Sequence, residues 1–216
     1  MDISKQINEV ERCFPSINFS PEKNEFSGEL NISELDSYQI RIVLNPYPRL
    51  FPDLFETEER IPNKPDRHIY TDTGACCLTT KAKAQVLLNT KIKTLKDFIK
   101  EIVIPYLQNN SYYEINKKYK TDEYAHFQQG VVDSYKDILK INDELIIGKT
   151  IYNRLLNPKL KIHQPCYCGS GIKLKKCSKS AHEIAYRDFK LIDREILHGD
   201  LEHNFMPLLK QKGVLQ

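Results

Sequence analysis

Apolar residues recur at helical spacing at the start of the chain and then alternate with polar residues. Residues 2–14 place apolar side chains every three or four positions, which predicts an amphipathic helix that Pro15 ends. Two alternating runs follow, with their apolar faces formed by Phe26, Leu30 and Ile32, and by Tyr38, Ile40, Ile42 and Leu44. The short link at 33–37 predicts that these strands pair antiparallel. Residues 52–57 predict one more strand.

The periodicity is poor between residues 61 and 93, where Pro62, Pro65 and Gly74 interrupt it. A stretch of this length with little regular structure is uncommon inside a compact domain and is usually functional. Thr94 then predicts a helix cap, and an apolar stripe follows it at Leu95, Phe98, Ile99, Ile102 and Val103. Pro105 is expected to disturb the end of that helix.

The second half of the chain reads as helices around a cysteine cluster. A helix is predicted over 125–141, with a buried face made of Val131, Val132, Tyr135, Ile138 and Leu139. Another is predicted over 142–156, ended by Pro158, with a basic linker up to Pro165. Ser180 is expected to cap a last long helix to Leu197, and residues 200–212 predict a short terminal helix.

Composition narrows the class of protein. The chain has 216 residues and a net charge of +3, which argues against a dedicated nucleic-acid binder. No apolar run approaches the length that a bilayer requires, and the first residues lack the plan of a signal peptide. We therefore expect a cytoplasmic protein without membrane partners, whose six cysteines are thiols or metal ligands rather than disulfides.

The segments around the adjacent cysteines resemble a known family. Tyr47-Pro48 with Pro52, the run Gly74-Ala75-Cys76-Cys77-Leu78, and Asp66-Arg67-His68-Ile69-Tyr70 match motifs of bacterial ubiquitin-conjugating-like proteins. The resemblance covers Phe19 to Leu107 and implies an N-terminal helix, a four-stranded antiparallel meander, a structured loop and a further helix. Thr73 is one residue more than the bacterial pattern has before its glycine, and the eukaryotic His-Pro-Asn signature is absent.

The resemblance also implies a chemistry. Cys77, at the Cys-Leu position, would form a thioester with a protein C-terminus and pass it to a lysine, with Cys76 packed inside. His68, Tyr70 or Asp72 would assist, because the asparagine thought to stabilise the oxyanion is missing. The implied partners are an adenylating activating enzyme and either a ubiquitin-like protein or the C-terminus of a nucleotidyltransferase, as in bacterial antiphage operons.

Other interpretations stay open at this stage. Both cysteines could be buried packing residues, and the same fold could serve as a non-catalytic binding or adaptor module. A metal-dependent hydrolase that uses Cys77, His68 and His126 is a third interpretation, although these residues show no known ligand spacing. For His126 itself we favour a role at the start of a helix over a functional one.

A second motif lies near the C-terminus. Pro165-Cys166-Tyr167-Cys168-Gly169-Ser170-Gly171, followed by Lys173, Lys175, Lys176 and Cys177, resembles the SEC-C motif, a small zinc-binding module. Three thiolates at this spacing suit a tetrahedral Zn²⁺, and the glycines permit the tight turn between them. Ser178 stands where the motif has its fourth ligand. His182 is the best substitute and His163 the next, unless the site is degenerate.

These patterns together predict an α+β chain. We expect a ubiquitin-conjugating-like antiparallel meander with flanking helices, plus a helical C-terminal region that holds a small zinc knuckle. The expected boundaries are 1–115 for the first domain, 116–160 for a helical extension, and 161–216 for the zinc motif and the last helices. The predicted metal ligands are Cys166, Cys168, Cys177 and His182, around a structural Zn²⁺.

Overall fold

The computed structural model describes residues 2–120, 127–156 and 160–213. The chain divides into two compact units. Unit 1 comprises Met1–Thr79 and Leu87–Glu123, and unit 2 comprises Thr80–Val86 and Tyr124–Gln216. The helices after residue 127 and the cysteine cluster therefore belong to one unit.

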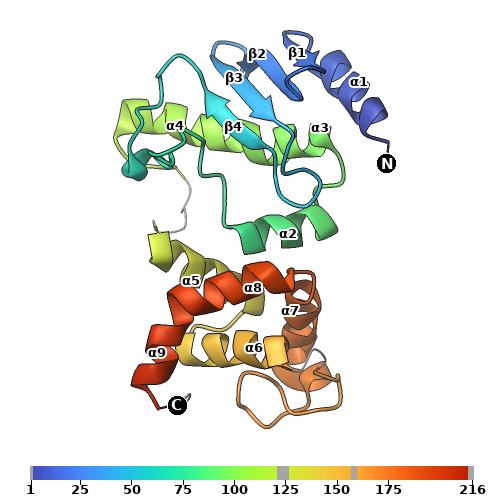
Figure 1. The fold of residues 1–216 in the computed structure, drawn as a ribbon, viewed down its shortest axis with the longest axis vertical. Helices are drawn as coiled ribbons and strands as arrows, with labels where there is room; N and C mark the ends of the chain where they lie inside the picture. The colour runs from blue at the N-terminus through green and yellow to red at the C-terminus, as the bar shows by residue number, and fades with distance from the viewer. Residues whose placement is uncertain (1, 121–126, 157–159, 214–216) are drawn as a thin grey trace. The chain divides into compact units, whose positions relative to one another are not determined.

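Unit 1 is built on an antiparallel meander with strand order β1-β2-β3-β4 (Figure 1). The strands are β1 (Ile17–Ser20), β2 (Glu25–Asn31), β3 (Ser37–Val43) and β4 (Asp53–Glu56). The register Phe26↔Ile42 and Leu30↔Tyr38 confirms the predicted pairing of the two alternating strands. These four side chains are buried, because alternation sends them all to the same face of the sheet.

Helices cover the buried face of this sheet. They are α1 (Ile3–Cys13), α3 (Leu95–Phe98) and α4 (Ile104–Asn116), with a π-helical turn at Ile99–Val103 between the last two. The amide of Gln108 on α4 donates to the carbonyl of Ile32 at 2.7 Å, and the hydroxyl of Tyr38 donates to Glu114 at 3.0 Å. The predicted cap is confirmed, since Thr94 and Asp97 form a reciprocal capping box.

The expectation that residues 61–93 hold little regular structure was wrong. The stretch 61–93 holds a 3₁₀ turn (Pro65–Arg67) but also a ten-residue helix, α2 (Lys81–Thr90). That helix has no wide apolar stripe, because its buried positions include Ala82, Ala84 and Gln85. The expected disturbance at Pro105 is confirmed, because α3 ends at Phe98 and a π-helical turn precedes the proline. The amide of Ile104 reaches back five residues to the carbonyl of Ile99, so α4 restarts at a place where proline needs no N–H.

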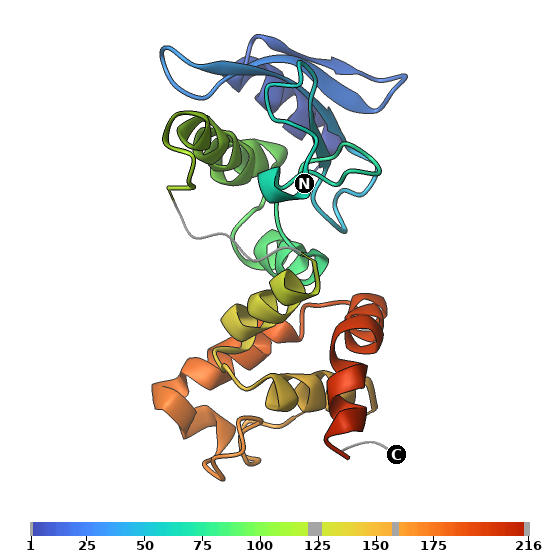
Figure 2. The same ribbon diagram turned by 90° about the vertical axis from the view of Figure 1, so that its left-hand side faces the viewer.

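Unit 2 is helical. It contains α5 (Phe127–Leu139), α6 (Glu144–Leu156), α7 (Ala181–Phe189), α8 (Arg194–Asp200) and α9 (Met206–Gln211), with a 3₁₀ segment at Leu174–Ser180 and a π-helical turn at Leu201–Phe205. Figure 2 shows α5 to α9 gathered around one another. Their core holds Tyr135, whose ring meets Phe189 and Phe205 edge-on.

The predicted helix from Ser180 to Leu197 is interrupted. Helix α7 ends at Phe189, and α8 begins after Asp193, whose backbone is extended. Gln85 accounts for the interruption: its side chain accepts from the Asp193 amide and donates to the Asp193 carboxylate, both at 2.7 Å. Ser180 precedes α7 without a side-chain cap, because its hydroxyl donates to the carbonyl of Lys175 at 2.9 Å.

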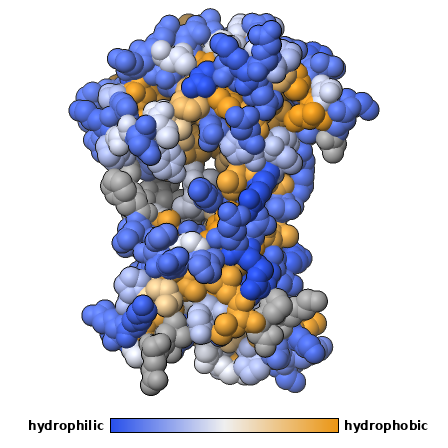
Figure 3. All heavy atoms as spheres, in the orientation of Figure 1, coloured by the Kyte–Doolittle hydropathy of each residue, from blue (hydrophilic) through white to orange (hydrophobic). Residues whose placement is uncertain are grey.

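On the face seen in Figure 3, hydrophilic side chains predominate and apolar ones lie between them. Within the described residues no helix combines the length and the apolar character needed to cross a bilayer.

Candidate functional site

A short hairpin carries the two adjacent cysteines. Ile69 and Cys76 form an antiparallel bridge. Beside it the amide of Tyr70 donates to the carbonyl of Ala75 at 2.8 Å. The turn closes at Gly74, which has φ +75° and donates its amide to the Tyr70 carbonyl at 2.7 Å. The predicted glycine is thus required by the left-handed backbone of this turn.

Side-chain alternation in this hairpin decides which cysteine faces outward. Cys76 lies opposite Ile69, and both are buried. Cys77 is one residue further on and therefore lies on the other face. Tyr70 shares that face, diagonally across the two strands from Cys77. The amide of Cys77 donates to the His68 carbonyl at 2.6 Å, which continues the pairing.

Cys76 is a packed residue. Its side chain is 6 % exposed, and its amide donates to the carbonyl of Leu54 on β4 at 2.8 Å, which ties the hairpin to the sheet. Burial raises the pKa of the Cys76 thiol to about 12, although a hydrogen bond with Tyr106 partly offsets this. A thiol with such a pKa carries almost no thiolate at neutral pH.

Cys77 is half-buried and its thiol donates to the Tyr70 hydroxyl across 3.3 Å. The Tyr70 side chain is 49 % exposed. Desolvation raises the pKa of Tyr70, and the adjacent Cys77 and the carboxylates of Asp53 and Asp72 raise it further. The phenol therefore keeps its proton at neutral pH and can donate it in a hydrogen bond to a thiolate or an oxyanion.

The other two predicted residues of this site are placed differently. His68 is buried in a left-handed conformation (φ +52°), with its ring edge-on to Tyr119 at a centroid distance of 5.5 Å. Its carbonyl, rather than its ring, holds Cys77. Asp72 is exposed at the tip of the hairpin and acts on the Tyr70 hydroxyl through its charge. His126 lies outside the described residues.

Sequence reasoning missed the residues that support the hairpin from α4. Arg67 is buried, donates to the Asn110 side chain at 3.0 Å and stacks over the ring of Tyr113 at 4.3 Å. The hydroxyl of Tyr106 donates to the His68 carbonyl at 3.0 Å. Tyr106 and Asn110 are four residues apart, so polar groups at helical spacing on the inner face of α4 were the available signal.

The predicted metal ligands meet in unit 2. One donor atom from each of Cys166, Cys168, Cys177 and His182 lies within 4.8 Å of the others. Nδ1 of His182 is 3.3 Å from the sulfurs of both Cys166 and Cys177, and the sulfurs of Cys168 and Cys177 are 3.5 Å apart. Ligands of a tetrahedral Zn²⁺ with Zn–S of about 2.3 Å lie about 3.8 Å apart, so this Cys3His set fits a metal ion.

The local backbone explains how the ligands converge. The amide of Cys166 donates to the carbonyl of Ile172 at 2.8 Å, and Gly169 and Gly171 take φ of +81° and +72° between these residues. Ser178, Lys179 and Ser180 then form three consecutive left-handed residues, with φ of +49°, +54° and +71°. This turn brings His182, in the first turn of α7, back to the thiols.

Ser178 is not a ligand but contacts one. Its hydroxyl lies 3.4 Å from Nε2 of His182, whose Nδ1 faces the sulfurs. A hydrogen bond to the outer nitrogen fixes the orientation and tautomer of a ligating histidine. His163, the alternative ligand, is exposed and lies outside the cluster.

The thiols of the cluster differ in acidity. Burial raises the pKa of Cys166 to about 12. Burial also opposes ionisation of Cys168, but hydrogen bonds from Ser170 and from the neighbouring thiols outweigh it and lower the pKa to about 6. Cys168 therefore supplies a thiolate readily, and metal binding must displace the proton of Cys166.

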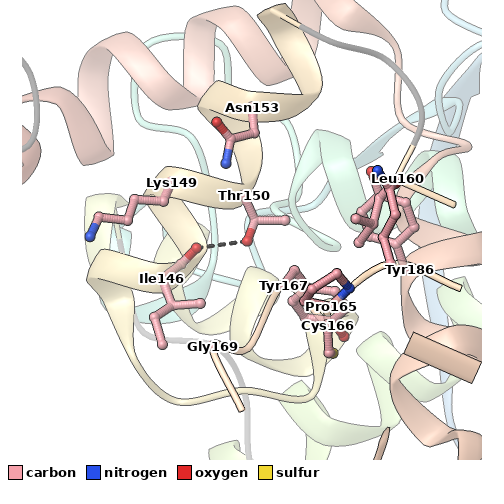
Figure 4. Close-up of a pocket in the computed structure, with 11 residues that line it drawn as sticks. Ile146, Lys149, Thr150, Asn153, Leu160, Pro165, Cys166, Tyr167, Gly169 and Tyr186 are labelled. Atoms are coloured by element: carbon pink, nitrogen blue, oxygen red, sulfur yellow. Dashed lines mark hydrogen bonds between the residues drawn. The ribbon is translucent and has the colours of Figure 1, made fainter. Parts of the chain in front are cut away.

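A cavity of about 670 Å³ lies beside the cluster, between α6 and the cysteine loop (Figure 4). Tyr167 and Tyr186 contribute to its wall, together with Lys149 and Asn153 from α6. The Thr150 hydroxyl already donates to the Ile146 carbonyl at 2.7 Å.

The hydroxyl of Tyr167 donates to the Leu139 carbonyl at 2.6 Å and so joins the cysteine loop to α5.

Comparison of the chain with protein-family models, with curated proteins and with solved structures finds no match.

Proposed function

We propose that this chain is an acyl-carrying enzyme of the ubiquitin-conjugating type, with Cys77 as its nucleophile. The observation that carries this proposal is the opposite placement of the two adjacent cysteines. Cys76 is buried with a strongly raised pKa, while Cys77 is half-exposed beside the hydroxyl of Tyr70. Catalytic thiols need access and a polar environment, which Cys77 has and Cys76 lacks.

The proposed reaction has two steps. The Cys77 thiolate attacks the activated carboxyl of a protein C-terminus, forms a thioester and expels the group that activated it. A lysine amine of the target then attacks the thioester, forms an amide and expels the Cys77 thiolate, and the amine proton passes to solvent or base. The carboxyl donor would be a ubiquitin-like protein or the C-terminus of a nucleotidyltransferase, supplied by an adenylating enzyme in an antiphage operon.

The Cys3His cluster has a structural role in this proposal. Four protein ligands would close the coordination sphere of a Zn²⁺, which leaves no position for substrate. When bound, the ion would join the cysteine loop to the start of α7, where the left-handed turn at residues 178–180 is otherwise held by hydrogen bonds such as that of Ser180.

One observation favours a second candidate function, that of a non-catalytic binding or adaptor protein. His68 is buried with its ring against Tyr119, so the histidine of the family motif has little access to a substrate. In this case Cys77 would carry no acyl group, and the hairpin would form part of a docking surface.

Intact mass separates the two functions. Wild type, Cys76→Ser and Cys77→Ser are purified from cells that hold the neighbouring genes, and their masses are compared with and without reductant. An adduct of protein mass that reductant removes, that persists in Cys76→Ser and that is absent or converted to a reductant-stable ester in Cys77→Ser supports acyl transfer. No adduct on any of the three proteins supports the adaptor function.

A further inference from the structure

An acyl transfer at Cys77 needs a hydrogen-bond donor for the negative charge that develops on the carbonyl oxygen. Each attack on the carbonyl carbon produces a tetrahedral intermediate whose oxyanion requires such a donor. The backbone amides of the two cysteines are already engaged. That of Cys76 donates to Leu54 at 2.8 Å, and that of Cys77 donates to His68 at 2.6 Å.

The Tyr70 hydroxyl is placed to be this donor. It lies 3.3 Å from Sγ of Cys77, and this sulfur is its only hydrogen-bond partner among the residues that the structure describes. The carbonyl carbon of a thioester is bonded directly to Sγ. Its oxygen can therefore come within the 2.7–3.1 Å that an effective oxyanion donor requires, by a small shift of the phenol.

The hairpin holds this side chain in position. Tyr70 donates its amide to Ala75 and accepts from the amide of Gly74, so its backbone is fixed on both sides. The residue as a whole is 49 % exposed, which leaves room for an incoming carbonyl group. The phenol is protonated at neutral pH like any tyrosine, and desolvation and the neighbouring thiol raise its pKa further.

We propose that Tyr70 is a catalytic residue whose hydroxyl donates a hydrogen bond to the oxyanion formed at the Cys77 thioester. This role rests on the proposed function, since it applies only if Cys77 carries an acyl group. In each step the carbonyl double bond opens to an oxyanion held by Tyr70. When the oxyanion collapses, it re-forms the double bond and expels the leaving group, which is the activating group in the first step and the Cys77 thiolate in the second. The phenol proton stays on Tyr70 throughout.

Two reactions of the same thiol test this role. The first is acylation of Cys77 by N-acetylglycine thiophenyl ester, followed by transfer to free lysine, and it passes through an oxyanion at each step. The second is alkylation by iodoacetamide, which displaces iodide at a saturated carbon and forms no oxyanion. Wild type, Tyr70→Phe and Cys77→Ser are compared by peptide mass mapping. Tyr112→Phe, which removes a half-buried hydroxyl from α4, is the matched control.

Tyr70→Phe should slow the acylation and the transfer to lysine by about 100-fold, the usual effect of removing one oxyanion donor. Its alkylation rate should fall by far less than its acylation rate, because alkylation forms no oxyanion and feels only the loss of the hydrogen bond between Tyr70 and the sulfur. Tyr112→Phe should match wild type in both reactions. Equal acylation rates in wild type and Tyr70→Phe, or equal losses in acylation and alkylation, would overturn the role of Tyr70. Wild type that is acylated no faster than Cys77→Ser would instead overturn the proposed function itself.

Discussion

The thiol of Cys77 and the hydroxyl of Tyr70 lie 3.3 Å apart on one face of a two-stranded hairpin. The bridge between Ile69 and Cys76 sets this relationship, because it fixes the register and alternation then sends Cys77 to the face of Tyr70. A slip of one residue would exchange the two cysteines. The hairpin therefore selects which of two identical side chains meets the solvent.

Truncating the two cysteines should have unequal effects on stability. Cys76→Ala removes a sulfur from a site that is 6 % exposed and should lower the free energy of unfolding by about 1–2 kcal/mol. Cys77→Ala removes a half-exposed thiol and should change it by less than about 0.5 kcal/mol. The two changes in the free energy of unfolding are measured by urea titration, with the hydrogen exchange of amides in unit 1 as the readout. Equal losses would mean that Cys77 is a packing residue too.

Metal content should depend on His182 and not on His163. Wild type should hold one metal ion per chain, and Cys177→Ala should hold none. His182→Ala should weaken metal binding by at least about 100-fold, since removing even an outer partner of a ligand costs 10–100-fold. His163→Ala is the matched control and should keep full occupancy. Titration with Co²⁺, read by its thiolate absorption bands, gives the affinities. Equal affinity in His182→Ala and His163→Ala would reject the Cys3His assignment.

The left-handed turn after Cys177 predicts a stabilising glycine. Lys179 is exposed with φ +54°, a conformation that costs a residue with a Cβ about 1–2 kcal/mol. Lys179→Gly should therefore raise the stability of the metal-free protein by about 1 kcal/mol. Lys176→Gly, at an exposed position of the preceding 3₁₀ segment, should lower it by about 0.5–1 kcal/mol. Both are measured by urea unfolding in chelator. If Lys179→Gly instead lowers the stability, the left-handed backbone at Lys179 is not strained.

Asp200 should make unit 2 less stable as the pH rises. Burial raises the pKa of this carboxyl, although the hydroxyl of Tyr135 donates to it at 2.8 Å. A group whose folded-state pKa is raised stabilises the fold fully below its unfolded pKa, about 3.9, and loses this contribution as the pH passes the folded-state value. Asp200→Asn cannot ionise and still accepts the Tyr135 bond.

Asp200→Asn should thus be more stable than wild type at pH 7, and the difference should shrink in acid. The urea midpoints of both proteins in chelator, at neutral pH and near the carboxyl pKa, provide the comparison. If the difference in stability between the two proteins does not change with pH, burial does not raise the pKa of Asp200.

The regular elements of unit 1 follow from local patterns. Alternation predicted β2 and β3 because their inner faces are made of large apolar residues, and Thr94 predicted the start of α3 because threonine is a favoured helix cap. Helix α2 could not be predicted in this way. Its buried positions are two alanines, Gln85 and Val86. The role of Gln85 depends on its hydrogen bonds with Asp193, which is more than a hundred residues away.

The sequence predicted the ligands of the metal site better than the roles of the residues around Cys77. The three cysteines were identifiable from their spacing, and His182 was the preferred fourth ligand, with His163 as the alternative, because the ligands lie within one short segment. The role of His68 was not identifiable, because its left-handed backbone turns the carbonyl toward Cys77 and buries the ring. The support from Arg67 and Asn110 is a tertiary contact that no local pattern encodes.

The opposite orientations of Cys76 and Cys77 underlie the functions proposed for this chain, and native-state alkylation tests them most directly. The folded protein is treated with iodoacetamide at neutral pH, and the modification of each cysteine is followed by tandem mass spectrometry. Cys77 should react in the folded state, whereas Cys76 should stay unmodified until denaturant unfolds unit 1, because its thiol is buried and has a pKa of about 12. Modification of Cys76 at the rate of Cys77, or protection of both until unfolding, would contradict the assignment of Cys77 as the nucleophile.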